Sequence, residues 1–356
     1  MVVGFTIYYN IIDFKKMETS MDKRILFIGT KFFSIEEQLI GKFEEYGFCV
    51  DFFDDRPSQN SWFKGISKLN AKVTRPFNKR YFNKIIESTR ERKYDIIFVL
   101  NGKTVDATFL KKLKGIFTKA EFVFYTYDSI KIYPEIYNTL KFYNRRYTFD
   151  LLDSKEITEL SFLPLFYNKK IVETADTYTD KNIDLLSVCT AHSNRYKVIK
   201  ELFPVLKAEG VNVFSYLYLN KLQYLYNKIF DVNFKNSKKQ EFEFIPLSEK
   251  ENYKLLKSTS VVFDVEHSKQ TGLTMRTIET LGFNKKLITT NKNIRNYNFY
   301  DSGNIFILEN AYSISNLVKF IFSPSHDVPK EIYEQYEIDK FVRIILGYDD
   351  LGDYLC

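Results

Sequence analysis

The sequence predicts an α/β protein built from two doubly wound domains. Its 356 residues exceed the length of one typical small domain and suit two. In both halves short apolar runs alternate with amphipathic segments, a pattern that favours parallel sheets covered by helices. A polar stretch at residues 167–182 separates the halves and is the expected linker. With 45% hydrophobic and 27% charged residues, the chain has the composition of a soluble globular protein.

The first domain is expected at residues 21–166, preceded by an N-terminal extension at residues 1–20. The run Arg24–Thr30 (RILFIGT) predicts a first strand, and Ile35–Tyr46 places its apolar residues at helical spacing. A second strand is expected at Phe48–Phe53, which completes a βαβ opening of the doubly wound type. The GxGxxG fingerprint of dinucleotide-binding proteins is absent from this opening.

Acidic residues accompany two later strands of the first domain. The apolar run Glu121–Tyr127 is followed by Asp128, and Tyr147–Leu152 predicts a short strand that contains Asp150. In open parallel sheets, ligands bind outside the carboxyl ends of the strands. Asp128 is therefore a candidate acid, base or hydroxyl-binding group, although an aspartate at this position can also cap the next segment.

The second domain, expected at residues 183–328, repeats the strand–polar loop–helix arrangement. A strand at Ile183–Cys189 leads through a polar loop into a helix at Tyr196–Glu209. Free N–H groups and the helix dipole make such a helix N-terminus an anion site. Three residues near this N-terminus suit a phosphate group: Ser193, Asn194 and Arg195. His192 either donates to a phosphate or orients the loop through local hydrogen bonds.

The most informative stretch, Phe263–Asn291, has the same arrangement: FDVEHSKQTGLTMRTIETLGFNKKLITTN. Gly272 allows the backbone to approach a ligand closely, and a threonine near it can cap the helix that follows. Arg276 adds a positive charge, and Glu279 lies on the same helix face. The N–H groups and the arginine suit a diphosphate, and the carboxylate suits ribose hydroxyls. An ordinary βαβ unit with a surface Arg–Glu pair has the same spacing.

Several of these segments resemble GT-B glycosyltransferases. QTGLTMRTIETLGFNKKLITTN is similar to the donor-site segment of bacterial cell-envelope glycosyltransferases, the group that includes CgeB-like proteins and lipopolysaccharide or capsule biosynthesis proteins. TYDSIKIYP and RRYTFDLLD in the first half, and CTAHSNRYK in the second, also resemble this group. The resemblance covers Arg24 to Leu308. It implies two Rossmann-like domains facing a cleft, with a C-terminal helix at residues 329–356 that crosses back to the first domain.

The resemblance implies transfer of a sugar from a nucleotide-diphosphate donor to a glycan or lipid-linked acceptor, in bacterial cell-surface polysaccharide biosynthesis. The second domain is the implied donor-binding domain, with Glu279 on the donor ribose and Arg195 and Arg276 on the leaving phosphate. The expected donor-binding residues are Ser193, Asn194, Arg195, His267, Gln270, Thr271, Gly272, Leu273, Thr274, Arg276 and Glu279.

Asp128 is the expected catalytic base, because a carboxylate at a strand end of the acceptor domain can reach the cleft. His192 and Asp150 are the reserves for this role. The family pattern is incomplete, since Gln270 or Thr271 stands about where broader GT-B families carry the first of two glutamates. No Asp-x-Asp motif is evident, and no metal or other cofactor is expected. Protein cations and helix dipoles would then stabilise the departing diphosphate.

Composition sets the remaining expectations. The net charge of +7 is spread along the chain and no nucleic-acid-binding motif is present, so nucleic acid is not an expected partner. The charge suits either a peripheral contact with the inner face of the cytoplasmic membrane or nothing more than solubility. Cys49, Cys189 and Cys356 form no CxxC pair, which favours a reducing, cytoplasmic compartment.

Other interpretations remain open at this level. A nucleotide-sugar epimerase on the same fold would use the same donor site without an acceptor. A non-catalytic nucleotide- or glycan-binding protein would keep the site and lack turnover. The basic, aromatic segment Lys221–Lys239 predicts a helix with a loop, for which a solvated surface is favoured over membrane contact.

Overall fold

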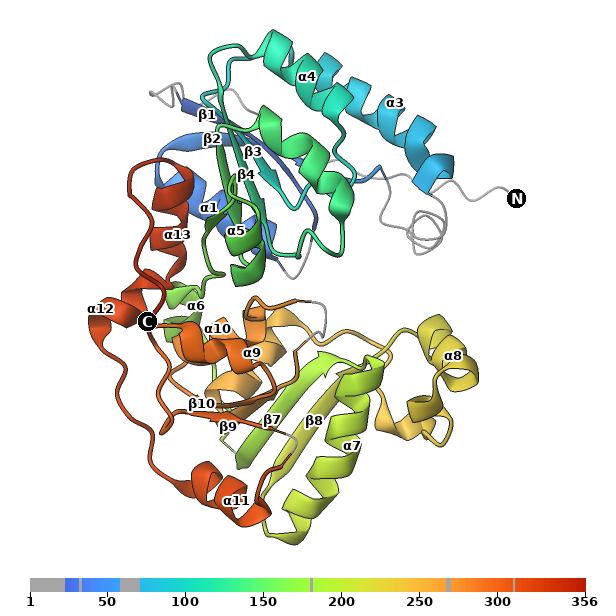
Figure 1. The fold of residues 1–356 in the computed structure, drawn as a ribbon, viewed down its shortest axis with the longest axis vertical. Coiled ribbons are helices and arrows are strands. Elements are labelled where there is room, and N and C mark those ends of the chain that lie inside the picture. The colour runs from blue at the N-terminus through green and yellow to red at the C-terminus, as the bar shows by residue number, and fades with distance from the viewer. Residues whose placement is uncertain (1–22, 32–33, 58–70, 180–181, 267–269, 310) are drawn as a thin grey trace.

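The computed structural model describes residues 23–31, 34–57, 71–179, 182–266, 270–309 and 311–356. The expected N-terminal extension, residues 1–20, and His267 lie outside these ranges. The chain folds into two α/β domains, each built around one parallel sheet, which lie one above the other in Figure 1. None of the described helices is long and apolar enough to cross a membrane.

Six parallel strands form the first sheet, in the order β2-β1-β3-β4-β5-β6. The strands are β1 Lys23–Gly29, β2 Phe48–Asp54, β3 Ile96–Leu100, β4 Glu121–Thr126, β5 Arg145–Thr148 and β6 Ser161–Phe162. The helices are α1 Ile35–Glu45, α3 Ala71–Thr89, α4 Ala107–Ile116, the 3-10 helix η1 Pro134–Phe142, and α5 Leu151–Glu156. Because β1 lies between β2 and β3, the sheet is doubly wound and its strand order reverses between β1 and β3.

The side chains of β1 alternate between two hydrophobic clusters, because successive residues of a strand point to opposite faces of the sheet. Ile25 and Phe27 pack with Phe43 of α1 on one face, whereas Leu26 and Ile28 join the cluster under α3 and α4. All five side chains are fully buried. Burial on both faces explains the continuous apolar run. Each such side chain contributes about 1.5–3 kcal/mol to stability.

The second sheet has five parallel strands in the order β11-β10-β9-β7-β8. The strands are β7 Ile183–Thr190, β8 Val213–Tyr218, β9 Thr259–Asp264, β10 Lys286–Thr289 and β11 Ile305–Ile307. The helices are α7 Ser193–Ala208, α8 Lys221–Phe230, α9 Glu249–Lys257, α10 Met275–Gly282 and α11 Ile314–Phe322, with short 3-10 turns at η2 Val232–Phe234, η3 Lys239–Glu241 and η4 Lys292–Asn296. The strand order reverses between β7 and β9, so both sheets share one winding pattern and the expected fold class is confirmed.

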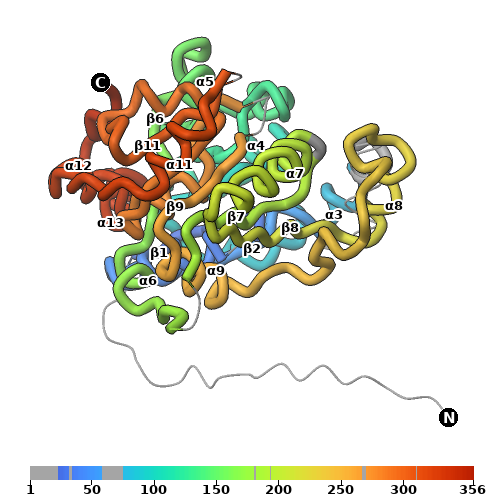
Figure 2. Tube along the Cα trace, turned by 90° about the horizontal axis from the view of Figure 1, so that it is seen from below, coloured from blue at the N-terminus to red at the C-terminus, as the bar shows by residue number. Residues whose placement is uncertain are grey.

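The C-terminal segment returns to the first domain. It contains α12 Lys330–Gln335 and α13 Ile338–Ile345. Tyr167, where the chain leaves the first domain, exchanges backbone hydrogen bonds with Tyr336 and Ile338, both at 2.8 Å. Phe341 packs edge-on against Tyr125 of β4, with ring centroids 4.8 Å apart. In Figures 1 and 2, α12 and α8 lie at opposite sides of the molecule. The expected crossing of the C-terminal helix is therefore confirmed.

At two places the chain begins a helix that the sequence did not predict, and in both a polar side chain caps the first turn of that helix. The polar stretch at residues 167–182 contains a short helix, α6 Lys169–Thr174, whose first turn is capped by the side chain of Asn168. The strand expected at Tyr147–Leu152 ends at Thr148, and Asp150 caps α5 instead. Asn and Asp side chains accept hydrogen bonds from first-turn N–H groups, which favours a helix start at these positions.

Candidate functional site

The carboxyl ends of the two sheets meet at the domain junction. Gln270, beyond the end of β9, donates from Nε2 to Oδ1 of Asp128, which follows β4 (3.2 Å). Thr271 donates its backbone N–H to Asp150, which follows β5 (2.8 Å). Ligands of open α/β sheets bind outside these strand ends, where the strand order reverses. The candidate site therefore lies at this junction, near the ends of β1 and β3 above and of β7 and β9 below.

Asp128 is held at the junction by three donors. Asn101 Nδ2 and Lys103 Nζ each reach its Oδ2 at 2.7 Å, and Gln270 reaches its Oδ1. Asn101 has a left-handed backbone (φ 67°), which asparagine tolerates, and its side chain accepts a hydrogen bond from Thr126. About 20% of the Asp128 side chain stays exposed. A carboxylate oxygen accepts two hydrogen bonds, so Oδ1 can still accept a proton from a ligand.

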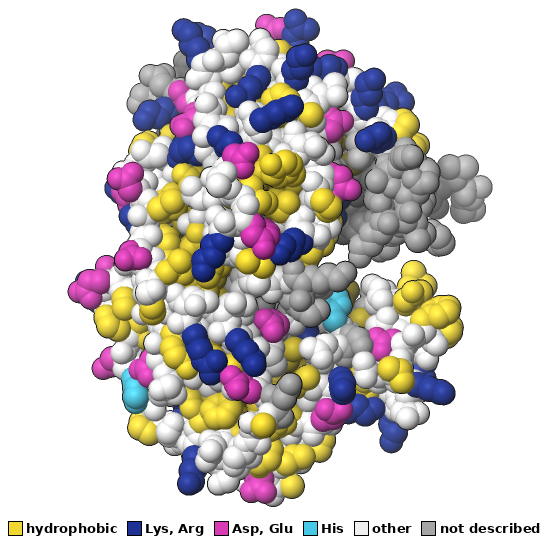
Figure 3. Space-filling view, viewed as in Figure 1, with side chains coloured by type: hydrophobic (Ala, Val, Ile, Leu, Met, Phe, Trp, Pro, Cys, Tyr) yellow, Lys and Arg dark blue, Asp and Glu magenta, His cyan; other side chains and the backbone are white. Residues whose placement is uncertain are grey.

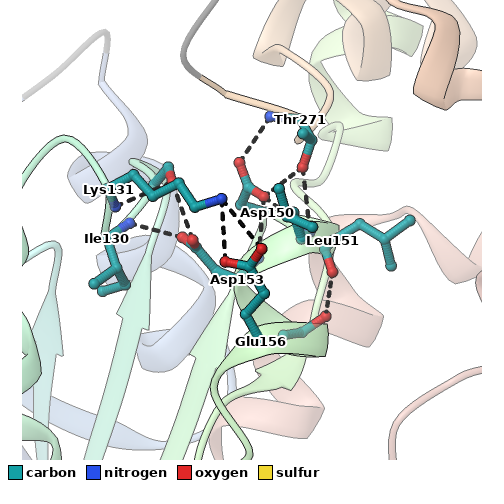
Figure 4. Close-up of polar contacts among 10 residues, drawn as sticks. Ile130, Lys131, Asp150, Leu151, Asp153, Glu156 and Thr271 are labelled. Atoms are coloured by element: carbon teal, nitrogen blue, oxygen red, sulfur yellow. Dashed lines mark hydrogen bonds and ion pairs between the residues drawn. The ribbon is translucent and has the colours of Figure 1, made fainter.

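Asp150 joins the two domains (Figure 4). Its Oδ2 accepts the backbone N–H groups of Thr271 (2.8 Å) and Gly272 (3.3 Å). Its Oδ1 accepts those of Leu152 (2.9 Å) and Asp153 (3.3 Å) and also the Thr271 hydroxyl. Asp150 is only 1% exposed and both oxygens are engaged, which favours a structural role over its expected role as a reserve base.

Gly272 lets the two domains approach closely. A Cβ at this position would lie 2.6 Å from a ring carbon of Phe149 and 2.8 Å from its carbonyl oxygen. The sequence predicts a ligand at this close approach, whereas in the structure Phe149 of the first domain makes it. Leu273, also expected at the diphosphate, is buried in the hydrophobic core. The loop before α10 therefore serves domain packing in this arrangement.

Thr274 is the threonine that caps α10. Its hydroxyl oxygen accepts the backbone N–H of Thr277 at 3.2 Å. The same hydroxyl donates to Asp264, the last residue of β9, which also accepts a hydrogen bond from the Thr277 hydroxyl (3.1 Å). These contacts fix the start of α10 to the end of the central strand.

Arg276 and Glu279 form an ion pair on one face of α10, with Nη1 3.0 Å from Oε2. Nη2 donates to Asn252 of α9 at 2.8 Å. The two side chains are only 15% and 13% exposed, and burial raises the pKa of Glu279 against the opposing charge of Arg276. Within the part of the chain that the structure describes, Nε of Arg276 has no hydrogen-bond partner. A buried guanidinium with an unused N–H is a candidate donor to an anion.

Positive charge gathers where the strand order of the second sheet reverses. Arg195 donates from Nε to the carbonyl oxygen of Val265, just after β9 (2.7 Å). Burial raises the pKa of the Cys189 thiol to about 11, and the charges of Arg195 and Arg276 act against this rise. Arg276 lies in the first turn of α10, which follows β9, so both arginines lie after the strand that pairs with β7. Helix α7 begins here at Ser193 and adds the positive end of its dipole. This arrangement suits a diphosphate.

Three other predicted site residues, His192, Asn194 and Glu279, lie at the surface or beside a small cavity. His192 precedes α7 and is exposed, as is Asn194 in its first turn. Glu279 lines a cavity of about 30 Å³ between α1 and α10, which is too small for a ribose. A groove of about 710 Å³ lies on the linker side between α1, α6 and α13 and is lined by side chains of both charge signs. Among the described residues, no group of three or more His, Cys, Asp or Glu side chains could hold a metal ion.

Two further carboxylates at strand ends were not singled out from the sequence. Glu266 follows β9, and burial raises its pKa to about 7, with Asp264 adding to the rise. Asp55 follows β2 and is fully buried, and burial raises its pKa to about 6 against the opposing charge of Arg56. Both lie within two residues of the end of a largely apolar strand. The signal that identified Asp128 would therefore have found them too.

Comparison with known proteins identifies the fold. No family profile and no curated protein matches this sequence. The apo form of the lipopolysaccharide outer core galactosyltransferase WaaB superposes with a TM-score of 0.53 at 13% identity, over 91% of this chain and 98% of that one. An alpha-glucosyltransferase in complex with UDP and a 13-mer DNA containing a central A:G mismatch gives a TM-score of 0.58 at 12% identity, over 91% and 99%. This chain has the GT-B fold.

A third GT-B neighbour agrees with this result. A glycosyltransferase from Rickettsia africae superposes with a TM-score of 0.53 at 14% identity, over 92% of this chain and 99% of that one. The three neighbours span both domains of the chain, and one acts in lipopolysaccharide synthesis by its description. The resemblance to GT-B glycosyltransferases, bacterial lipopolysaccharide ones among them, is thus confirmed at the level of the fold.

Proposed function

We propose that this protein transfers a sugar from a nucleotide-diphosphate donor to a hydroxyl group of a glycan or lipid-linked acceptor. One observation carries the proposal: Arg195, Arg276 and the N-termini of α7 and α10 lie after the paired strands β7 and β9, while Asp128 lies across the junction. The UDP bound to a glucosyltransferase of the same fold supports a nucleotide donor. The galactosyltransferase of the lipopolysaccharide outer core supports a bacterial cell-surface glycan as acceptor.

In this proposal the second domain holds the donor through its diphosphate. The two arginines and the α7 dipole balance the negative charge that grows on the departing nucleoside diphosphate. Nε of Arg276, which is buried and has no hydrogen-bond partner among the described residues, is the proposed donor to the diphosphate. Because these groups supply the compensating charge, the proposed chemistry uses no metal ion.

The bond changes of the proposed transfer follow from these positions. The acceptor oxygen attacks the anomeric carbon of the donor sugar. The bond between this carbon and the phosphate oxygen breaks, and the nucleoside diphosphate leaves with the electron pair. Asp128 takes the proton of the acceptor hydroxyl, since its carboxylate is part-exposed at the junction. His192 is kept as the reserve base.

Glu279 is proposed to hold the donor ribose, but the structure sets a condition on this role. The cavity beside Glu279 has room for about one water molecule, and Gln38 of α1 and Met275 of α10 are among the residues that line it. A ribose can reach the carboxylate only if α1 and α10 separate. The proposal therefore links ribose binding to an opening of the domain junction.

Thermal denaturation with nucleoside diphosphates and nucleotide sugars tests the donor site. A ligand at a hundred times its Kd stabilises the folded protein by about 2.7 kcal/mol. Arg276→Ala removes a charge-assisted contact worth about 1.5–3 kcal/mol, so the Kd should rise about tenfold to over a hundredfold. Arg90→Ala is the control, because this exposed arginine pairs with its neighbour Glu91 in the first domain. An unchanged Kd in Arg276→Ala would contradict the proposed donor site.

Asp128→Asn tests the base. Loss of general base catalysis should lower turnover by about 10²–10⁴-fold while the donor Kd stays the same. Asp106→Asn, at an exposed helix cap in the same domain, is the control and should keep full turnover. Mass spectrometry of the products with the donor alone distinguishes the rivals. An isomerised donor sugar would show an epimerase, and no turnover with any donor and acceptor would favour a binding protein.

A further inference from the structure

Helix α8 carries its apolar stripe on the outside of the molecule. The stripe follows the spacing i, i+3, i+4, i+7 and i+8, which marks one face of a helix. It consists of Leu222, Leu225, Tyr226, Ile229 and Phe230, which are 57–73% exposed. In a globular domain such a stripe normally faces the core. We call these five residues the α8 stripe.

Polar contacts hold the opposite face of α8 against the domain. Asn227 is buried, at 8% exposed, and Lys228 donates from Nζ to the carbonyl oxygen of Ser237. Tyr224 supplies an aromatic contact, with its ring centroid 5.4 Å from that of Phe242. Turning the stripe inward would break these contacts and would leave the buried acceptor, the carbonyl oxygen of Ser237, without its lysine donor. The outward orientation of the stripe is therefore built into the domain.

Lysines surround the α8 stripe. The segment Lys221–Lys239 contains five lysines and a single acidic residue, Asp231, which gives it a net charge of +4. Four of these lysines are exposed: Lys221, Lys235, Lys238 and Lys239. Val232, at 82% exposed, extends the apolar surface beyond the helix. Figure 3 shows hydrophobic side chains gathered over α8 with basic side chains beside them. A stripe of this kind flanked by lysines complements an anionic lipid surface.

The position of α8 also suits a flat partner. The helix protrudes at one side of the molecule in Figures 1 and 2. It is capped by Asn220, two residues after the end of β8, so it starts at the same carboxyl edge of the sheet as the candidate site. A protruding helix can lie in the plane of a bilayer interface, with its apolar face at the boundary between headgroups and acyl chains.

We infer that α8 docks this protein onto an anionic lipid bilayer. The α8 stripe enters the interface and the surrounding lysines contact the lipid phosphates. A second copy is the less suitable partner, because a two-fold contact through the stripe would bring the same lysines together across the interface. Docking through α8 places the carboxyl edge of the second sheet near the membrane. The consequence that a lipid-linked acceptor reaches the site from the membrane rests on the proposed function.

Vesicle sedimentation with the full chain tests the inference. The protein should sediment with vesicles that contain phosphatidylglycerol, much less with phosphatidylcholine alone, and less as salt is added. The triple variant Leu225→Ser, Ile229→Ser and Phe230→Ser should lose about tenfold or more of its vesicle partitioning. Phe322→Ser is the matched control, since Phe322 is 57% exposed on another helix, and it should sediment as the unchanged protein does.

Further measurements separate docking from folding and from the donor site. The triple variant should keep its melting temperature and its stabilisation by a nucleoside diphosphate, because the altered side chains are exposed. Lys235→Gln, Lys238→Gln and Lys239→Gln together should weaken sedimentation at low salt. Equal sedimentation of the unchanged protein and the variant with serine at positions 225, 229 and 230 would overturn the inference. So would a dimer, seen by light scattering, that the triple variant abolishes while vesicle binding is absent.

Discussion

Asp150→Asn tests whether one carboxylate joins the two domains. Asparagine keeps the size of the side chain but replaces one acceptor oxygen with an NH₂ donor. If the remaining oxygen stays on the first turn of α5, the NH₂ group faces the N–H groups of Thr271 and Gly272, which now lie 2.8 and 3.3 Å from Oδ2. Hydrogen bonds to a charged acceptor contribute about 1.5–3 kcal/mol each. Losing two of them should destabilise the junction by about 3 kcal/mol or more.

Hydrogen exchange measures this loss at the amides concerned. A destabilisation of about 3 kcal/mol should speed exchange at Thr271 and Gly272 by about a hundredfold, if these amides exchange through opening of the junction. Asp106→Asn is the control, because Asp106 caps α4 within its own domain through Phe109. Asparagine caps helices about as well as aspartate. Equal exchange rates in the two variants would refute the assignment of Asp150 as the domain link.

Three more predictions concern the junction, a position within α1 and the end of β9. Gly272→Ala should destabilise the protein by about 1–3 kcal/mol in urea unfolding through overpacking against Phe149. Gly41→Ala, where no atom lies within 4 Å, should be neutral or stabilising by up to about 1 kcal/mol. In Glu266→Gln, stability should match the unchanged protein below pH 4.5 and exceed it by about 1–3 kcal/mol above pH 7. The unchanged protein loses stability across this window because its folded state raises the pKa of Glu266 from 4.5 to about 7.

Periodicity was enough to predict the α/β class and the two domains. The apolar runs at β1 and β7 are continuous because both faces of each sheet are covered, and the helices between strands show one apolar face. The winding of both domains and the returning C-terminal helix followed from this pattern and the family resemblance. Local caps were harder to predict, since Asp150 sits in a run of apolar residues that equally suits a strand.

Which partner a predicted residue meets could not be predicted, because the contacts are long-range. The loop before α10 was expected to hold an anion, and it does bind a carboxylate, but this belongs to Asp150, 121 residues earlier in the chain. Helical spacing in α8 likewise predicts an apolar face and not the direction in which that face points. The buried pairing of Arg276 with Glu279 agrees with their spacing, whereas the closed cavity beside Glu279 depends on α1 of the other domain.

A crystal structure with a bound nucleoside diphosphate tests the central claim most directly. The account predicts the diphosphate at the carboxyl ends of β7 and β9, within hydrogen-bond distance of Arg195 or Arg276 and close to the N-terminus of α7. A diphosphate bound on the first sheet, or in the groove between α1, α6 and α13, would contradict it.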